Sequence, residues 1–235
     1  MPHPLIVSYY TPGTAYEARA ASLREDVRRL GLNARIEPRA ARGSWLENCA
    51  QKALFIREMY QAERCALLWL DADARLFRPL HEVENIAADF AVVRRQGWEF
   101  MSGQIYFGST PVAGRLLDLW CDYCERFPHI WDQVSLGYAW WELSLREDFS
   151  TLWLRESLYR RVAKHRFGKL LQRFSARPPV IHLQESRRSK SRQGLTALPE
   201  FGMDDLPAWW RAAAMRQAPF PLDESQRRDL GIANQ

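Results

Sequence analysis

The feature that most constrains this chain is a continuous apolar run, residues 65–70 (Cys-Ala-Leu-Leu-Trp-Leu), which ends abruptly in Asp71-Ala72-Asp73. An apolar run of this length, without the polar alternation of a half-exposed strand, predicts a central β-strand covered on both faces. Open α/β sheets bind their ligands beyond the carboxyl ends of the strands. The two aspartates therefore lie where a ligand is expected, provided that the rest of the chain builds such a sheet.

The rest of the chain alternates strand patterns with helical patterns. We expect strands at residues 5–10, 33–37, 90–93, 104–107, 151–154 and 180–181, and helices over about 15–30, 44–61, 110–127 and 133–143. Gly31 supplies a C-terminal stop for the first helix, and Ser44 with Glu47 forms a capping box for the second. This alternation predicts an α/β fold with an open, mainly parallel sheet and helices on both faces.

Length and composition favour one main domain. The chain has 235 residues, 47% of them hydrophobic, which is enough for a sizeable core. We expect residues 1–193 to form the domain and residues 194–235 to pack on it as a wrapping tail. No segment reaches the roughly 18 apolar residues of a membrane span, and the N-terminus lacks a signal-peptide pattern, so we expect a cytoplasmic protein without a membrane anchor.

The four cysteines, Cys49, Cys65, Cys121 and Cys124, are too few for a disulfide scaffold in a chain this long. Cys121-x-x-Cys124 falls in the middle of a predicted helix and has no second cysteine pair at zinc-ribbon spacing. We therefore expect four reduced thiols, with Cys121 and Cys124 packed in the core.

Asp71 and Asp73 are the first candidate ligands. Side chains two residues apart on an extended chain project to the same side, and paired carboxylate oxygens suit Mg²⁺ or Mn²⁺, which would in turn hold a diphosphate. An isolated Asp-x-Asp also occurs as a polar turn that ends a strand. The motif by itself leaves both interpretations open.

Further segments follow in a definite order: Ser102-Gly103-Gln104-Ile105-Tyr106-Phe107 with Thr110-Pro111, then Trp131-Asp132-Gln133, then Ile181-His182. Together with residues 69–73 they resemble the ordered motifs of nucleotide-sugar glycosyltransferases with the GT-A fold. The resemblance spans about residues 5–192, and the chain is similar in particular to a family of small bacterial and phage glycosyltransferases, which have a His-x-Gln-x-Ser-Arg segment like that at 182–187.

The resemblance implies a metal-dependent transfer of a hexose or pentose from a nucleoside-diphosphate sugar to an acceptor hydroxyl, with retention of anomeric configuration. It implies a metal site of Asp71, Asp73 and His182, which would hold Mn²⁺ better than Mg²⁺ because imidazole is a softer ligand than carboxylate. Asp132 and Gln133 would act in catalysis. The implied donor-binding residues are Tyr9, Tyr10, Thr11, Lys52, Asp71, Ser102, Gly103, Gln104, Arg187 and Lys190.

Several of these residues have ordinary structural alternatives. One of Tyr9 and Tyr10 could belong to the core while the other covers the sheet edge, and Lys52 could be a solvated helix residue. Asp132 could be a helix N-cap, and His182 could be a hydrogen-bonded histidine at a strand end.

Residues 155–192 carry the basic excess of the chain, with twelve Lys or Arg against two Glu, and we call them the basic segment. We expect it to be largely helical. It could be a solvated basic face, or it could attract a polyanion. The acceptor is then a glycan or, as an alternative, a modified base turned out of duplex DNA. A non-catalytic nucleic-acid-binding protein is the remaining possibility.

Overall fold

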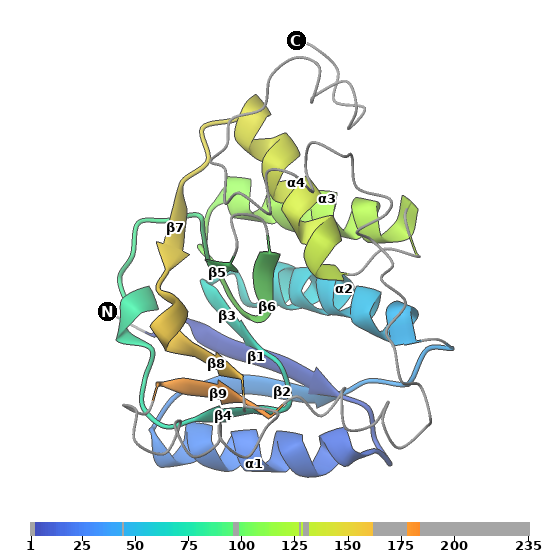
Figure 1. Ribbon diagram of the computed structural model, residues 1–235, viewed down its shortest axis with the longest axis vertical. Coiled ribbons are helices and arrows are strands. Elements are labelled where there is room, and N and C mark those ends of the chain that lie inside the picture. The colour runs from blue at the N-terminus through green and yellow to red at the C-terminus, as the bar shows by residue number, and fades with distance from the viewer. Residues whose placement is uncertain are drawn as a thin grey trace.

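A computed structural model describes residues 3–43, 45–95, 99–126, 128, 132–161 and 178–183. Its main sheet has six strands in the order β2-β1-β3-β6-β5-β7 (Figure 1). The strand bounds are β1 Leu5–Tyr10, β2 Ala34–Pro38, β3 Leu67–Leu70, β5 Phe90–Arg95, β6 Glu99–Phe107 and β7 Thr151–Leu154. The helices are α1 Ala15–Arg29, α2 Trp45–Glu63, α3 Pro111–Arg126 and α4 Asp132–Arg146.

The sheet is mixed and mostly parallel, as the sequence predicted. β1 pairs in parallel with β2 and β3, and β5 pairs in parallel with β7, whereas β6 runs antiparallel to both of its neighbours, β3 and β5. β6 begins earlier than expected, at Glu99, so Ser102 and Gly103 lie within a strand. Every strand except β6 therefore ends at the same edge, the edge that carries Asp71 and Asp73.

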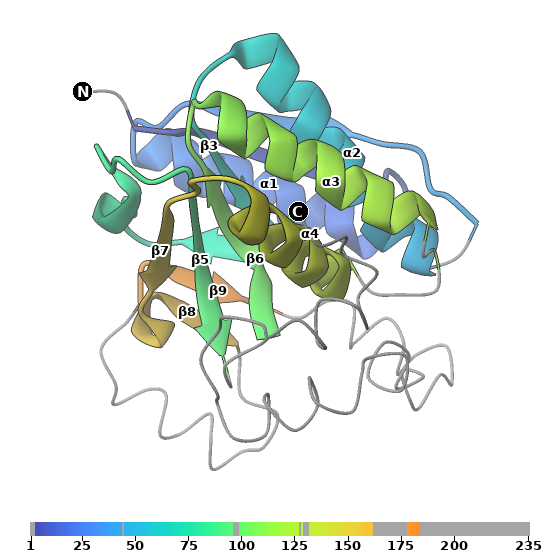
Figure 2. The same cartoon turned by 90° about the horizontal axis from the view of Figure 1, so that it is seen from above.

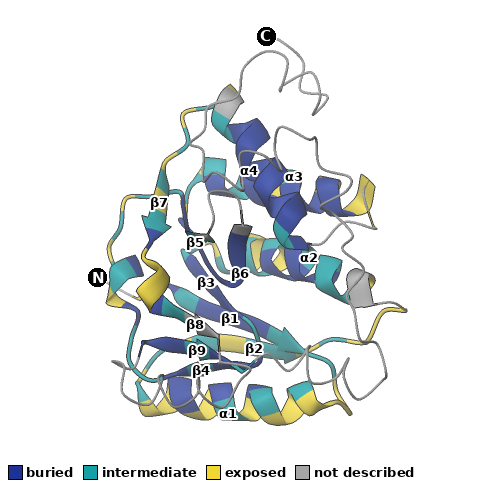
Figure 3. Cartoon of the chain, in the orientation of Figure 1, coloured by how far each residue is buried: buried dark blue, intermediate teal, exposed yellow. Residues whose placement is uncertain are grey.

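Helices cover both faces of this sheet. One core cluster joins α2, α3 and α4 to one face and contains Phe55, Trp69 and Trp120; the other lies on the α1 side and contains Ile6, Leu23 and Tyr106. α3 packs against α2 and α4 (Figure 2), and Figure 3 shows buried residues along these helices. The α/β architecture with helices on both faces is confirmed.

Local sequence explains where α1 begins and ends. The Thr14 hydroxyl accepts a hydrogen bond from the N–H of Tyr16, 3.2 Å away, which caps the first turn. After Leu30 the chain turns at Gly31, whose φ of +67° is one that glycine adopts without strain.

A second sheet of three short strands, in the order β4-β9-β8, lies on the α1 side (Figure 1). Its strands are β4 Ala74–Leu76, β8 Tyr159–Arg161 and β9 Val180–His182, and two 3₁₀ turns, η1 His81–Val83 and η2 Glu156–Leu158, complete the described elements. The sequence predicted neither β4 nor β8. Pairing with β9 makes residues 159–161 extended, so the expectation of a helical basic segment is wrong at this end.

Some expectations fall outside the described residues: the Ser44 half of the capping box, residues 162–177 and 184–192 of the basic segment, and the tail 194–235. None of the helices that the structure describes is both long enough and apolar enough to cross a bilayer.

Candidate metal and donor site

The Asp-x-Asp segment forms a turn rather than an extended strand end. The carbonyl oxygen of Asp71 accepts a hydrogen bond from the N–H of Ala74 at 2.8 Å, which bends the chain from β3 into β4. The expected geometry of two carboxylates on an extended chain is therefore wrong. The turn nevertheless leaves Asp71 half-buried and Asp73 buried at the edge of the sheet.

His182 joins the two aspartates from a distant part of the sequence. β9 pairs antiparallel with β4 so that His182 lies opposite Ala74, and the N–H of Leu183 donates to the carbonyl of Asp73 at 3.1 Å. The Nδ1 atom of His182 lies 3.9 Å from Oδ1 of Asp73. One potential ligand atom from each of Asp71, Asp73 and His182 falls within 4.8 Å of the other two.

Gly103 makes room for this convergence. Its carbonyl accepts the N–H of Asp71 at 2.9 Å, so its backbone lies directly beside the cluster. A Cβ atom at this position would lie 3.0 Å from Oδ2 of Asp71 and 2.8 Å from Cε1 of His182. At these distances the side chains of His182 and Asp71 would have to move, so glycine at this position leaves them room to converge.

The three side chains fit a divalent cation. Two carboxylates and an imidazole offer hard oxygen donors with one borderline nitrogen, which suits Mn²⁺ and less well Mg²⁺. Oδ1 of Asp71 is already engaged, because it accepts a hydrogen bond from the Trp69 indole at 2.9 Å and lies 3.1 Å from Nζ of Lys52. Oδ2, on the side of Gly103 and His182, is the oxygen left for a cation.

Lys52 connects the cluster to Asp132. Its ammonium lies 3.1 Å from Oδ1 of Asp71 and 3.0 Å from Oδ2 of Asp132, and it donates to the carbonyl and hydroxyl of Ser102 at 3.2 and 3.3 Å. Burial by itself would lower the pKa of Lys52, but the carboxylates of Asp132 and Asp71 outweigh it and raise that pKa above its ordinary value. Lys52 is therefore a buried cation that ties α2, β3, β6 and α4 together, not a solvated helix residue.

Asp132 and Gln133 stand at the start of α4. Asp132 is the first residue of the helix and is buried, with its carboxylate on Lys52, while Gln133 is half-buried. The carbonyl of Asp132 accepts a hydrogen bond from the Trp120 indole of α3 at 2.8 Å, which fixes this end of the helix. The catalytic role of Asp132 stays a prediction, and its pairing with Lys52 could not have been predicted from spacing in the sequence.

The two tyrosines at the end of β1, Tyr9 and Tyr10, make different contacts. The Tyr9 hydroxyl donates to the carbonyl of Asn48 at 2.5 Å, and its ring packs against Phe55 and Trp69. Burial raises the pKa of this phenol. Tyr10 and Thr11 are half-buried at the same sheet edge as Asp71, and the guanidinium of Arg24 lies over the Tyr10 ring, 4.9 Å from its centroid.

Gln104 is fully buried opposite Leu70, on the α1 side of the sheet. Its amide oxygen and nitrogen have no hydrogen-bond partner among the residues that the structure describes. Arg187 and Lys190 lie outside the described residues.

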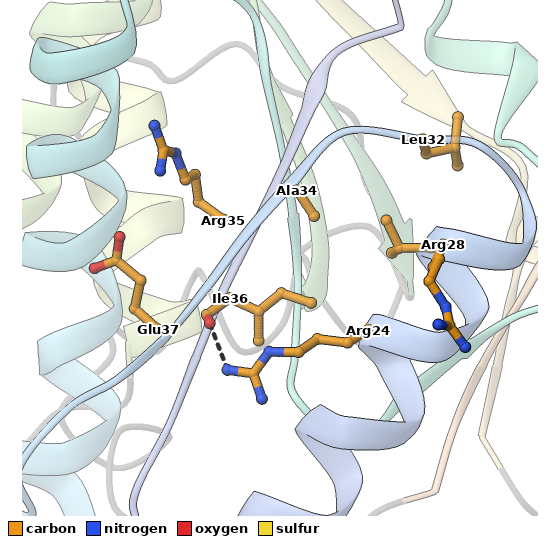
Figure 4. Close-up of a pocket in the computed structure, with 8 residues that line it drawn as sticks. Arg24, Arg28, Leu32, Ala34, Arg35, Ile36 and Glu37 are labelled. Carbon is orange, nitrogen blue, oxygen red and sulfur yellow. Dashed lines mark hydrogen bonds between the residues drawn. The ribbon is translucent and has the colours of Figure 1, made fainter.

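A separate groove of about 450 Å³ lies between α1 and β2 (Figure 4). Its arginines already have partners: Arg24 donates to the carbonyl of Ile36 at 2.6 Å, Arg28 pairs with Glu25, and Arg35 pairs with Glu63. None of its lining residues belongs to the metal cluster.

Solved structures resemble this arrangement of strands and helices. A glycosyltransferase involved in the glycosylation of the major capsid of PBCV-1 matches with a TM-score of 0.62 at 12% identity, over 82% of this chain and 98% of the other. The fold is GT-A-like.

Two further structures match more loosely, each with a TM-score of 0.45. They are mouse xyloside xylosyltransferase 1, at 10% identity over 78% of this chain and 98% of that one, and galactosyltransferase LgtC with donor and acceptor sugar analogues, at 12% identity over 83% and 98%. No family model matches the sequence, and no curated protein sequence does either.

Proposed function

We propose that this protein is a metal-dependent glycosyltransferase that moves a sugar from a nucleoside-diphosphate sugar to an acceptor hydroxyl. The observation that carries the proposal is the convergence of Asp71, Asp73 and His182 at the carboxyl edge of the sheet of a GT-A-like fold. Open α/β sheets bind their ligands at this edge. A turn that merely ends a strand would not need three potential ligand side chains brought together from two separate segments of the chain.

The donor would lie along the same edge. Tyr10 and Thr11, at the end of β1, would face the nucleoside, and Gly103 with Ser102 would let the donor approach the backbone of β6. Tyr9 and Lys52 would support the donor site from below, because the Tyr9 hydroxyl is held by the Asn48 carbonyl and the Lys52 ammonium by Asp132. Arg187 and Lys190 remain candidates for the diphosphate.

A bound Mn²⁺ would neutralise negative charge that builds up on the departing diphosphate. In the retaining reaction, the bond from the anomeric carbon to the diphosphate oxygen breaks and a bond from the acceptor oxygen forms on the same face. The acceptor hydroxyl gives its proton to the departing diphosphate oxygen. Asp132 and Gln133 would stabilise the positive charge that develops on the sugar ring.

A thermal-shift screen tests the proposal. UDP- and GDP-sugars are added with and without Mn²⁺ to the wild type, to Asp73→Ala, and to Asp122→Ala, which removes an exposed carboxylate on α3 as a control. A bound donor stabilises the folded chain by mass action, so we expect a rise in melting temperature that needs both Mn²⁺ and Asp73 but not Asp122. If no donor shifts the wild type, or if Asp73→Ala responds like the wild type, the proposal is wrong.

Product analysis then tests the stereochemistry. The nucleotide sugar that gives the largest shift is incubated with the protein, Mn²⁺ and simple glycosides, and the anomeric configuration of the product is read by NMR. A product with the donor's configuration supports the retaining reaction, and an inverted product contradicts it.

A further inference from the structure

An aromatic ring covers the imidazole of the candidate metal ligand His182. The ring of Tyr159 stacks on that imidazole with centroids 4.4 Å apart and planes inclined by 22°. Tyr159 is half-buried, and His182 is 2% exposed. Neither the sequence motifs nor the proposed reaction uses Tyr159.

The small sheet brings the two rings together. β8 and β9 run in parallel with Tyr159 opposite Val180, so His182 lies two residues along β9 and on the same face. Leu158, buried in the α1-side core, anchors the chain just before Tyr159. On its other side β9 pairs with β4, which fixes the backbone of His182 beside Asp73.

Backbone pairing alone does not orient an imidazole. The side chain still rotates about two bonds, and a metal bond to a ring nitrogen lies in the plane of the ring. The tilt of the ring plane therefore decides whether Nδ1, now 3.9 Å from Oδ1 of Asp73, points at the shared space between the ligands. A stacked aromatic ring restricts that tilt without occupying the nitrogen.

We propose that Tyr159 is a positioning residue that holds the His182 imidazole in its ligating orientation. The inference rests on the proposed function, since it assumes that His182 binds a metal ion. Groups that orient metal ligands from outside the coordination shell commonly contribute 10–100-fold, roughly, to metal affinity. It is the aromatic face that acts, so the phenol hydroxyl is dispensable.

The Mn²⁺ affinity of the full chain, measured without any sugar donor, tests this positioning role of Tyr159 directly. Free Mn²⁺ is followed by its electron paramagnetic resonance signal as protein is added. We expect Tyr159→Leu to bind Mn²⁺ about tenfold more weakly and Tyr159→Phe to bind within about twofold of the wild type. Ile181→Val, a packing change on the opposite face of β9 from His182, serves as the control for general disturbance of the small sheet and should leave the affinity within about twofold.

A measurement in the His182→Ala variant separates a positioning role of Tyr159 from a merely structural one. If Tyr159 acts through His182, then adding Tyr159→Leu to His182→Ala should cause no further loss of Mn²⁺ affinity. An equal additional loss in that background, or a Tyr159→Phe variant as weak as Tyr159→Leu, overturns the proposal. Unchanged affinity in Tyr159→Leu overturns it too, while leaving the metal site of the wild type intact. A wild type that binds no Mn²⁺ overturns both this inference and the metal dependence on which it rests.

Discussion

At the scale of single residues, the site depends on Gly103, which has no side chain, and on the buried ammonium of Lys52. Gly103 lets Asp71 and His182 approach each other, and Lys52 gives the carboxylates of Asp71 and Asp132 a common partner. Both residues act by permitting charges to converge where the sheet edge would otherwise keep them apart. Substitution of Gly103 should therefore weaken metal binding more than the fold, whereas substitution of Lys52 should strongly destabilise the fold.

Gly103→Ala should damage the metal site more than the fold. Its Cβ would meet His182 at 2.8 Å and Asp71 at 3.0 Å, so these two side chains must move. We expect Mn²⁺ affinity to fall by about tenfold or more, and the unfolding free energy to fall by about 1–3 kcal/mol. Isothermal titration with Mn²⁺ and urea unfolding measure the two effects.

Gly43→Ala is the matched control, because its Cβ would meet only the end of the flexible Glu47 side chain. Its Mn²⁺ affinity should equal that of the wild type. Mn²⁺ binding by Gly103→Ala at wild-type strength would show that the cluster does not bind the ion.

Lys52→Met should destabilise the fold strongly, because it leaves the buried carboxylate of Asp132 without its cation. Breaking a buried ion pair on one side costs about 3–5 kcal/mol. Adding Asp132→Asn to Lys52→Met should recover part of that loss, since the orphaned charge is then removed. Urea unfolding of the single and double variants measures the energetic coupling between Lys52 and Asp132.

Arg57→Met, on the same helix, is the comparison. Arg57 forms a surface ion pair with Asp118 at 3.7 Å, so this change should cost no more than about 1 kcal/mol. If Lys52→Met costs as little as Arg57→Met, Lys52 does not hold the site together.

At the scale of elements, the main sheet was predictable and the small sheet was not. The run at 65–70 and the helical periodicities carry enough local signal to place β3 and the four helices. β4 and β8 have three residues each and pair with β9, which lies over 100 residues from β4 along the chain. No local pattern encodes such a pairing, so the resemblance could suggest His182 as a ligand but not how the chain carries it to Asp73.

Asp26 shows how an element outside the site supports it. Its carboxylate, buried on α1, accepts hydrogen bonds from Nε of Arg75 at 2.6 Å and from the N–H of Leu76 at 3.0 Å, which fastens β4 to the helix. Burial alone would raise the pKa of Asp26, but these hydrogen bonds and the charge of Arg75 lower it overall. The ionised carboxylate therefore stabilises the folded state.

Asp26→Asn should lower the unfolding free energy by about 2–4 kcal/mol at pH 7. A lowered folded-state pKa gives stability that is present above the ordinary aspartate pKa, about 3.9, and is lost as pH falls through the folded-state value. The gap between variant and wild type should thus shrink below about pH 4. Urea unfolding across pH 3–7 tests this, with Asp122→Asn, at the exposed Asp122–Arg126 pair, as the control that changes little. A gap that does not depend on pH would contradict the role of the carboxylate charge.

At the scale of the whole molecule, one core cluster joins three helices to the sheet. It contains Cys121 and Cys124 of α3 together with Trp69 of β3, Phe55 of α2 and Trp141 of α4. All four cysteines are free, as the sequence predicted, and these two are buried. The reactivity of these two thiols therefore shows whether the core cluster unfolds in parts or only as a single unit.

Burial raises the pKa of Cys121 to about 11 and also raises the pKa of Cys124. Since the thiolate is the reactive form, both should resist a disulfide reagent at pH 8 while the chain is folded. We expect a variant lacking Cys49 and Cys65 to release no thiol signal in buffer and two thiols in denaturant. Near the unfolding midpoint, with excess reagent, the labelling rate should match the unfolding rate and be independent of reagent concentration. Rapid labelling in buffer would mean that α3 detaches locally, and the cluster would then not be a single cooperative unit.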